Sequence, residues 1–232
     1  MTQLAENIRA VKQRIAETAA KIGRKPESIL LVAVAKTQTA ETVEQALQQG
    51  ITDWGENKVQ EAAAKLPLLT TPYHCFHFIG HLQTNKVKAL LKLKPGLIHS
   101  VDSLHLAREI SVRSAEMNRV QDILLQVNTS GEGSKSGCEP QELITLAKAV
   151  CELPNLKIKG LMTIGRLSDV PEDSRQDFRL LKSLFEELQE MEEPVLEPEW
   201  LSMGMTNDYI IAIEEGANLV RIGSAIFGAR HY

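Results

Sequence analysis

Apolar residues recur at helical spacing near the start of the chain. Steps of three, four and seven residues place them on one stripe of a helix: Leu4, Ile8, Val11, Ile15 and Ile22. Gly23 follows and predicts the end of this helix. Residues 29–35 then form an unbroken apolar run rich in Val and Leu, which is typical of a strand covered on both faces in a parallel sheet.

The alternation of helix-like and strand-like patterns continues along the rest of the chain. Further strands are predicted at 51–57, 75–80, 96–102, 122–128, 156–165, 199–205 and 218–228. Helices are predicted at 40–50, 58–66, 84–93, 103–118, 140–153, 174–191 and 207–216. The Pro- and Glu-rich patch at 191–200 indicates a loop between the long helix before it and the next strand.

These elements define a fold class. Alternating strand–helix units imply a parallel sheet. Eight strands in a chain of 232 residues predict an α/β fold, a single (β/α)8 TIM barrel with an extra N-terminal helix, forming one domain over residues 1–232. A doubly wound open sheet is the alternative. Such a sheet usually has a glycine-rich turn after its first strand. Here the segment "AVAKTQ", which covers the end of the first strand and the turn after it, contains no glycine.

Composition and charge narrow the class of protein. The net charge is -4 and no basic run stands out, which argues against a nucleic-acid partner. No apolar stretch reaches the length of a membrane span, and the amphipathic N-terminus lacks the apolar core of a secretory signal. Three widely spaced cysteines, Cys75, Cys138 and Cys151, predict free thiols in the cytoplasm, and the histidines form no metal-ligand pattern.

Polar residues follow several predicted strands, at the end of a barrel where active sites lie. The segments 202–208 and 221–225 follow the last two strands, which is the common phosphate site of such barrels. Their glycines let backbone N–H groups approach an anion, and their hydroxyls add donors. Thr206 or Asn207 is also placed to cap the helix that follows.

Lys36 comes directly after the first apolar strand. Partial burial of an amine favours its neutral, nucleophilic form, which can form a Schiff base with a carbonyl. Beside a phosphate site, this predicts a phosphorylated aldehyde as ligand. Two candidates follow from the residues alone: pyridoxal 5'-phosphate (PLP) held as a cofactor, and a sugar phosphate cleaved by an aldolase.

With these residues in view, the whole chain resembles the YggS/PROSC family of pyridoxal phosphate homeostasis proteins. The resemblance rests on ordered motifs: "LVAVAKTQ", "GENKVQE", "FHFIGHLQTNKVK", "VDSLHLA", "LLQVNTSGEGSKSG", "GLMTIG", "LSMGMTND" and "VRIGSAIFG". It extends to the barrel domain of bacterial alanine racemase, the wider fold-type III class. This resemblance makes the alternative of a sugar-phosphate aldolase remote.

The resemblance implies roles for individual residues. Lys36 would hold PLP as an internal aldimine, Asn57 would lie near the ring, and Arg221 would face the pyridine nitrogen. The phosphate would be surrounded by Ser202, Gly204, Met205, Thr206, Gly223 and Ser224. Thr206 stands where the family usually has serine, which keeps the hydroxyl.

Other positions in the motifs carry weaker implications. Gln38 stands where many family members have a second lysine, so any role of that lysine is absent here. Lys135 matches a family lysine near the barrel mouth and is a candidate for a secondary contact. His81 lies in a loop at a strand end and is a further candidate for a functional residue, although a packing role is the simpler interpretation.

The resemblance favours a carrier over an enzyme. A permanent cation at Arg221 disfavours protonation of the pyridine nitrogen and weakens the ring as an electron sink. The chain ends soon after the last predicted strand, so we expect no second domain, no catalytic base on the opposite face, a monomer, and a cofactor open on one side. We therefore expect a PLP carrier, buffer and regulator without catalytic residues or bound metal, with apo PLP enzymes as candidate recipients. A single-domain PLP enzyme of the amino acid racemase type is the alternative.

Overall fold

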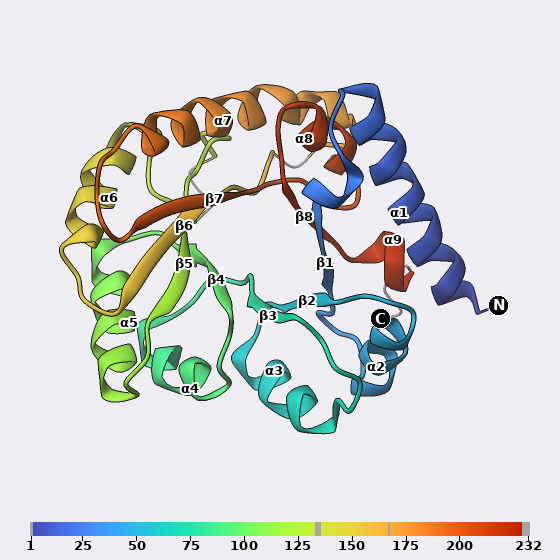
Figure 1. Ribbon diagram of the computed structural model, residues 1–232, viewed down its shortest axis with the longest axis horizontal. Coiled ribbons are helices and arrows are strands. Elements are labelled where there is room, and N and C mark those ends of the chain that lie inside the picture. Colours follow the sequence, from blue (N-terminus) through green and yellow to red (C-terminus); the bar gives the residue numbers. More distant parts are fainter. Residues whose placement is uncertain (1, 133–135, 167, 229–232) are drawn as a thin grey trace.

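Eight parallel strands close into a barrel in the computed structural model, which describes residues 2–132, 136–166 and 168–228 (Figure 1). Each strand pairs with the next along the chain, and β8 pairs with β1. The strands are β1 Leu30–Val34, β2 Asp53–Glu56, β3 Cys75–Phe78, β4 Leu97–Val101, β5 Gln121–Gln126, β6 Leu156–Met162, β7 Leu196–Ser202 and β8 Leu219–Ile222. The predicted (β/α)8 fold is confirmed.

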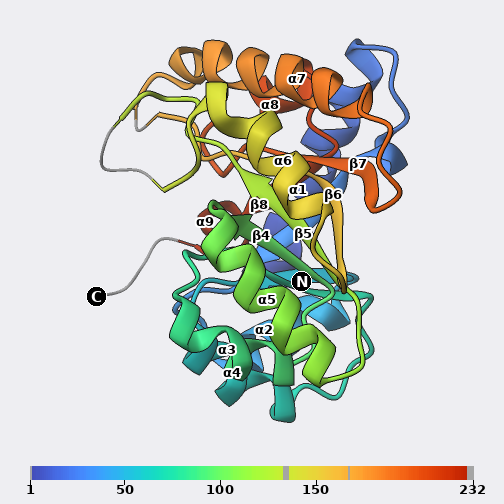
Figure 2. The same cartoon turned by 90° about the vertical axis from the view of Figure 1, so that its left-hand side faces the viewer.

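Helices form a layer around the strands (Figure 1). They are α1 Gln3–Lys21, α2 Ala40–Gln48, α3 Val59–Lys65, α4 Val87–Lys92, α5 Leu104–Glu116, α6 Leu143–Cys151, α7 Arg175–Gln189, α8 Tyr209–Glu214 and α9 Ser224–Phe227. Short 3-10 turns lie at η1 Pro26–Ser28, η2 Leu66–Leu68, η3 Thr84–Lys86, η4 Pro140–Glu142 and η5 Pro171–Ser174. The extra N-terminal helix is α1, which packs against α8 and α9. In Figure 2, α5 and α6 lie in front of the strands that they cover.

Alternation along the strands produces two cores, because successive side chains point to opposite faces. Outward-facing residues such as Ala33, Trp54 and Ile98 pack under the helices in one large cluster. A small apolar cluster fills the inside of the barrel: Val32, Leu97, Leu124, Met162 and Leu219. In the described part of the chain, no helix combines the length and apolar character needed to cross a bilayer.

The Pro- and Glu-rich patch predicted as a loop is partly strand, because β7 already begins at Leu196. Its acidic side chains pair with lysines on the adjacent strand β6. Lys157 Nζ lies 2.6 Å from Glu197 Oε1, and Lys159 Nζ lies 3.2 Å from carboxylate oxygens of both Glu197 and Glu199. Opposite charges on neighbouring strands therefore compensate for a segment of poor strand propensity.

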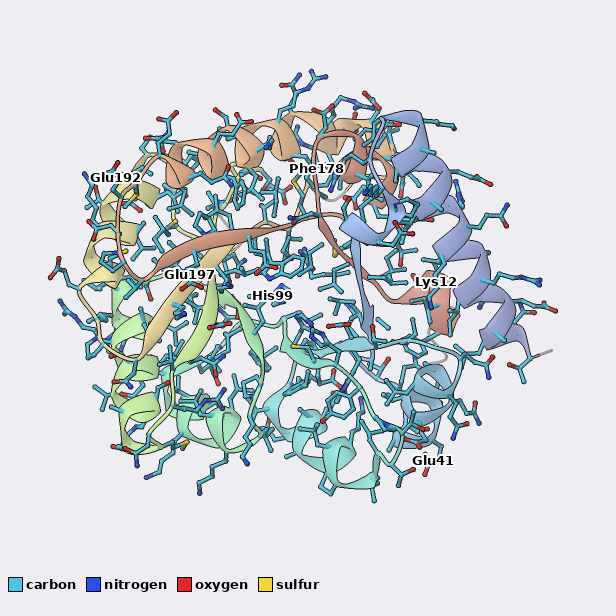
Figure 3. All side chains as sticks on the ribbon, in the orientation of Figure 1. Lys12, Glu41, His99, Phe178, Glu192 and Glu197 are labelled. Atoms are coloured by element: carbon cyan, nitrogen blue, oxygen red, sulfur yellow. The ribbon has the colours of Figure 1, made fainter. Side chains whose placement is uncertain are left out.

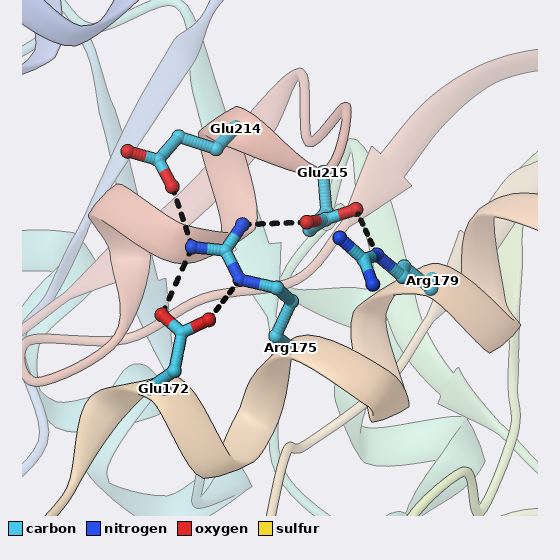
Figure 4. A network of polar contacts seen from close by, with 5 residues as sticks. All are labelled: Glu172, Arg175, Arg179, Glu214 and Glu215. Atoms are coloured by element: carbon cyan, nitrogen blue, oxygen red, sulfur yellow. Dashed lines mark hydrogen bonds and ion pairs between the residues drawn. The ribbon is translucent and has the colours of Figure 1, made fainter.

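An ion-pair network joins α7 to α8 (Figure 4). The Arg175 guanidinium, at the start of α7, donates to Glu172, to Glu214 Oε2 at 2.8 Å and to Glu215 Oε1 at 2.5 Å. Arg179, one turn further along α7, donates to Glu215 Oε2 at 3.0 Å. The network fixes α8, and α8 in turn supports the loop that follows β7.

Candidate functional site

A cavity of about 640 Å³ lies at the C-terminal ends of the strands. This volume is in the range of sites that bind small molecules. Its lining includes seven of the nine predicted cofactor residues: Lys36, Asn57, Met205, Thr206, Arg221, Gly223 and Ser224. These residues come from segments far apart in the sequence, and the parallel barrel brings them to one end.

Lys36 lies two residues beyond β1, on a turn held from both sides. The Ala35 carbonyl before it accepts a hydrogen bond from Lys65 Nζ at 2.8 Å. The Thr37 N–H after it donates to Glu61 Oε2 at 3.1 Å. Thr37 has a φ of 67°, in the left-handed region that β-branched residues rarely adopt. The turn is therefore fixed by its partners rather than by local preference.

The side chains that hold this turn form an ionic cluster, in which Glu56 and Lys65 are buried and Glu61 is partly exposed. Lys65 Nζ lies 2.5 Å from Glu56 Oε2 and 3.5 Å from Glu61 Oε2. Burial raises the pKa of Glu56 above its ordinary value, against the opposing effect of Lys65. The second oxygen of Glu56 accepts the Asn57 N–H at 3.1 Å. One cluster thus orients the backbone at both Lys36 and Asn57.

Asn57 brings an unsatisfied polar atom to the cavity. Its Oδ1 is buried, and no described residue forms a hydrogen bond with it. Buried polar atoms normally have a partner, so this oxygen leaves a hydrogen-bonding position for a water molecule or a ligand group. The segment after β3 approaches this residue closely and requires glycine, because a Cβ on Gly80 would lie 2.1 Å from the Asn57 carbonyl oxygen.

The loop after β7 is shaped by glycine and by an aspartate. Gly204 has a φ of 91°, and a Cβ there would lie 2.5 Å from a side-chain carbon of α8. Asp208 Oδ1 accepts the Met205 N–H at 2.6 Å and closes the loop. Thr206 Oγ1 accepts the Ala225 N–H at 3.4 Å, which joins this loop to the one after β8.

The prediction that Thr206 or Asn207 caps the next helix is wrong. The residue that precedes the first turn of α8 is Asp208, and it makes no side-chain capping bond. The Thr206 hydroxyl is directed to the loop after β8 instead. Residues 206 and 207 therefore belong to the cavity wall and not to the helix.

Ser202 and Gly204 lie behind the cavity wall rather than in its lining. Ser202 is fully buried, and its Oγ accepts a hydrogen bond from Arg221 Nη1 at 2.6 Å. Arg221 Nη2 donates to the Thr163 carbonyl at 2.8 Å. Burial lowers the pKa of Arg221 to about 10, which leaves the guanidinium charged at neutral pH. Gly204 contacts Arg221 through its carbonyl, which accepts the Arg221 N–H at 3.0 Å.

Several lining residues were not among the predicted set. Gln126 and Arg166 come from the ends of β5 and β6, and Gln38 lines the wall at the position where many family members carry lysine. Arg166 and Gln38 follow predicted strands, which is the same signal that identified Lys36, whereas Gln126 lies within the predicted strand 122–128. His81 also lines the cavity, with Ser136 Oγ 3.3 Å from its Nδ1. Lys135 lies outside the described residues.

Asp53, Cys75 and His77 bring potential metal-binding atoms within 4.8 Å of one another, although the sequence has no metal-ligand pattern. Hydrogen bonds already engage the carboxylate, which lies 3.2 Å from His77 Nε2 and 2.9 Å from His74 Nδ1. Burial and the charge of Asp53 raise the pKa of the Cys75 thiol to about 12. A protonated thiol is a poor metal ligand, so we assign no ion to this group. All three cysteines are free thiols.

The fold and the cavity define a class of barrel with a lysine and two glycine-containing loops, after β7 and β8, at its mouth. The family model described as "Alanine racemase, N-terminal domain" matches residues 1–231. Alanine racemase from Corynebacterium glutamicum shares this fold, with a TM-score of 0.71 at 15% identity over 98% of this chain and 62% of its own. The chain is therefore an alanine racemase-like (β/α)8 barrel.

Closer relatives specify the family. The pyridoxal phosphate homeostasis protein of Aquifex aeolicus is 44% identical over 227 residues, which cover 98% of each protein. The structure of PipY from Synechococcus elongatus with PLP bound has a TM-score of 0.79 and 33% identity, over 92% of this chain and all of that one. The chain belongs to the family of pyridoxal phosphate homeostasis proteins.

Proposed function

We propose that this protein binds PLP in the cavity at the barrel mouth and acts in intracellular PLP homeostasis, as a carrier and buffer without catalytic turnover. One observation carries the proposal: an amine, a guanidinium and hydroxyls from four separate loops or strands line a single cavity of about 640 Å³. This set matches the parts of PLP, which has an aldehyde, a pyridine ring and a phosphate. The names of the close relatives support the homeostatic role.

Each residue of the site has a task in this proposal. PLP supplies an aldehyde that condenses with an amine, and Lys36 provides that amine. Thr206 and Ser224 donate hydroxyls to the phosphate, with backbone groups around Gly204, Met205 and Gly223 forming the rest of its cradle. Arg221 faces the pyridine nitrogen, and Asn57 lies near the ring. Ser202, behind the wall, supports Arg221.

Arg221 also argues against turnover. A charged guanidinium next to the pyridine nitrogen disfavours its protonation, and an unprotonated ring is a poor sink for carbanion electrons. The racemase-type alternative would need a protonated ring or another electron sink. We further propose that the protein works in the cytoplasm as a monomer of one domain, and that apo PLP enzymes receive the cofactor.

The test of this proposal is covalent trapping at Lys36. The purified protein should absorb in the visible range, and reduction with borohydride should place the adduct on the Lys36 peptide in mass spectrometry. Lys36→Ala should abolish the adduct. Lys58→Ala is the matched control, because Lys58 lies near the same turn but is 63% exposed and does not line the cavity. A dominant adduct on another lysine would contradict the assignment.

A further inference from the structure

A chain of hydrogen bonds crosses the interior of the barrel behind the cavity. It begins at Asp53 Oδ1, which lies 3.2 Å from His77 Nε2. His77 Nδ1 lies 2.9 Å from His99 Nε2, and His99 Nδ1 lies 3.0 Å from Ser202 Oγ. Ser202 Oγ accepts from Arg221 Nη1 at 2.6 Å. His99 lies near the middle of the barrel in Figure 3.

The two ends of the chain impose the same direction on every link. A guanidinium only donates, so Ser202 Oγ accepts from Arg221. A carboxylate only accepts, so His77 Nε2–H donates to Asp53. A neutral imidazole has one donor and one acceptor, so His77 Nδ1 accepts from His99 Nε2–H, and His99 Nδ1 in turn accepts the O–H of Ser202. All four bonds then point from Arg221 toward Asp53.

The environment of the chain maintains this arrangement of protons. Burial lowers the pKa of His77 and lowers that of His99 well below its ordinary value, so both imidazoles are neutral at pH 7. For Asp53, burial alone would raise the pKa, but hydrogen bonds from His77, His74 and Thr52 outweigh it and lower the pKa. Asp53 is therefore a carboxylate, as the direction of the chain requires.

We propose that His77 and His99 are positioning residues that, through Ser202, fix the guanidinium of Arg221 against the pyridine nitrogen of PLP, with Asp53 as the terminal acceptor. This inference rests on the proposed function, because it assigns the groups that control the cofactor ring. It assigns no contact between either histidine and the cofactor. The effect passes through one atom, Ser202 Oγ, whose lone pair is made a better acceptor by donation of its proton to His99.

Apolar packing alone would not require this chain. Its members come from β2, β3, β4, β7 and β8, and all are at most 4% exposed. The interior next to them is apolar, with Leu97 on the same strand as His99. Burying polar side chains is costly unless each is hydrogen-bonded, and here the bonds lead to Arg221, a buried charged group that lines the cavity.

The test compares variants by the visible spectrum and the release rate of bound PLP. His99→Leu removes both bonds of the imidazole, and we expect a shifted band with a new pH dependence and release faster by about tenfold. His99→Gln keeps one donor and one acceptor and should restore the wild-type band. Leu97→Ala is the matched control, because it destabilises the same strand without touching the chain. A shift in Leu97→Ala equal to that in His99→Leu would overturn the proposal.

A double-variant comparison tests the path through Ser202. Ser202→Ala should shift the band in the same direction as His99→Leu. If His99 acts through Ser202, adding His99→Leu to Ser202→Ala should change the band no further, whereas independent effects would add. Full additivity would show that His99 acts by another route and would overturn the proposal.

A measurement without cofactor separates this inference from the proposed function. Nitrogen-15 NMR of the apo protein should show both histidines neutral with the proton on Nε2, and Asp53→Asn should change the tautomer populations. Nδ1 protonation in either ring would contradict the chain. If the apo protein shows these tautomers but wild-type protein forms no PLP adduct, the proposed function fails. If wild-type protein binds PLP and His99→Leu has the wild-type spectrum, only the further inference fails.

Discussion

At the scale of single residues, the hydrogen bonding of Thr206 indicates where its hydroxyl proton points. Its Oγ1 accepts the Ala225 N–H and lines the cavity, so it connects the loops after β7 and β8. An accepted hydrogen bond from the backbone leaves the hydroxyl proton directed elsewhere. We propose that this proton is donated to the phosphate of PLP.

Substitution of Thr206 tests this role. We expect Thr206→Ala to weaken PLP retention by about 1 kcal/mol, or roughly fivefold, because one neutral donor is lost. Thr206→Ser should retain the affinity, since it keeps the hydroxyl. Equilibrium dialysis measures both, and circular dichroism checks that the barrel is intact. Equal affinities for Thr206→Ala and wild type would rule out a direct contact.

The buried histidines predict how stability depends on pH. In the folded state the pKa of His99 is well below its ordinary value, while an unfolded histidine takes up a proton below about pH 6.5. The unfolded state then binds more protons, so stability is full above pH 6.5 and falls as the pH decreases. The slope approaches about 1.4 kcal/mol per pH unit for each such histidine. His77 contributes in the same direction.

Urea unfolding between pH 7.5 and pH 5 measures this slope. His99→Gln does not titrate and should flatten it. The depressed pKa of Asp53 contributes stability that is present above about pH 3.9 and lost below, so it lies outside this window. The raised pKa of Glu56 opposes the trend at acid pH but is common to both proteins. Identical slopes for the two proteins would show that His99 is not held neutral.

At the scale of elements, α3 controls the end of β1. Lys65, in the last turn of α3, reaches back to the Ala35 carbonyl and to the fully buried Glu56 carboxylate. The turn that presents Lys36 is therefore supported by a helix more than twenty residues away in the sequence. Buried ion pairs of this kind are costly to break from one side, since the remaining charge stays buried.

Lys65→Met should reduce the free energy of unfolding by about 3–5 kcal/mol, because Glu56 loses its partner. The double variant with Glu56→Gln should recover part of the loss. Lys58→Met is the control: its exposed pair with Glu61 should contribute at most about 1 kcal/mol. Chemical denaturation gives all three values. A loss in Lys65→Met no larger than in the control would mean that the cluster is not a support of the turn.

At the scale of the whole molecule, the proposed carrier function makes a prediction about exchange. Lys36 and the loops after β7 and β8 lie at the mouth of the barrel, so outside amines should reach PLP bound there. We expect loaded protein to restore the activity of an apo PLP enzyme faster than free dissociation of PLP allows, and to show no turnover of common amino acids. Lys36→Ala loaded with PLP is the control for the transfer.

Two outcomes would change this view. A robust turnover number on any amino acid, lost in Lys36→Ala, would favour the racemase-type alternative. Transfer no faster than free dissociation would remove the delivery role and leave only buffering. Light scattering of the same samples tests the proposed monomer.

The sequence by itself determined the barrel, and seven of the nine predicted cofactor residues line the cavity. An apolar run followed by a polar strand end is a local pattern, and parallel closure brings all such ends together. This pattern therefore placed Lys36 and the segments 202–208 and 221–225 at one end of the barrel, whereas the roles of Asn57 and Arg221 came from the family resemblance. The partly stranded segment at β7 was missed because its stability depends on lysines from β6, which no local pattern shows.

Only the tertiary structure decided which polar side chains support the site from behind. Lys65 looks like an ordinary helix lysine, and His77 and His99 look like packed strand residues. Their roles depend on strand register and on depth inside the barrel, because these decide that His99 meets Ser202 rather than solvent. At the same depth the Ser202 oxygen accepts a hydrogen bond from Arg221, whereas Thr206 lines the cavity. Periodicity fixes the face on which a side chain lies, but only packing across non-neighbouring strands fixes its partner.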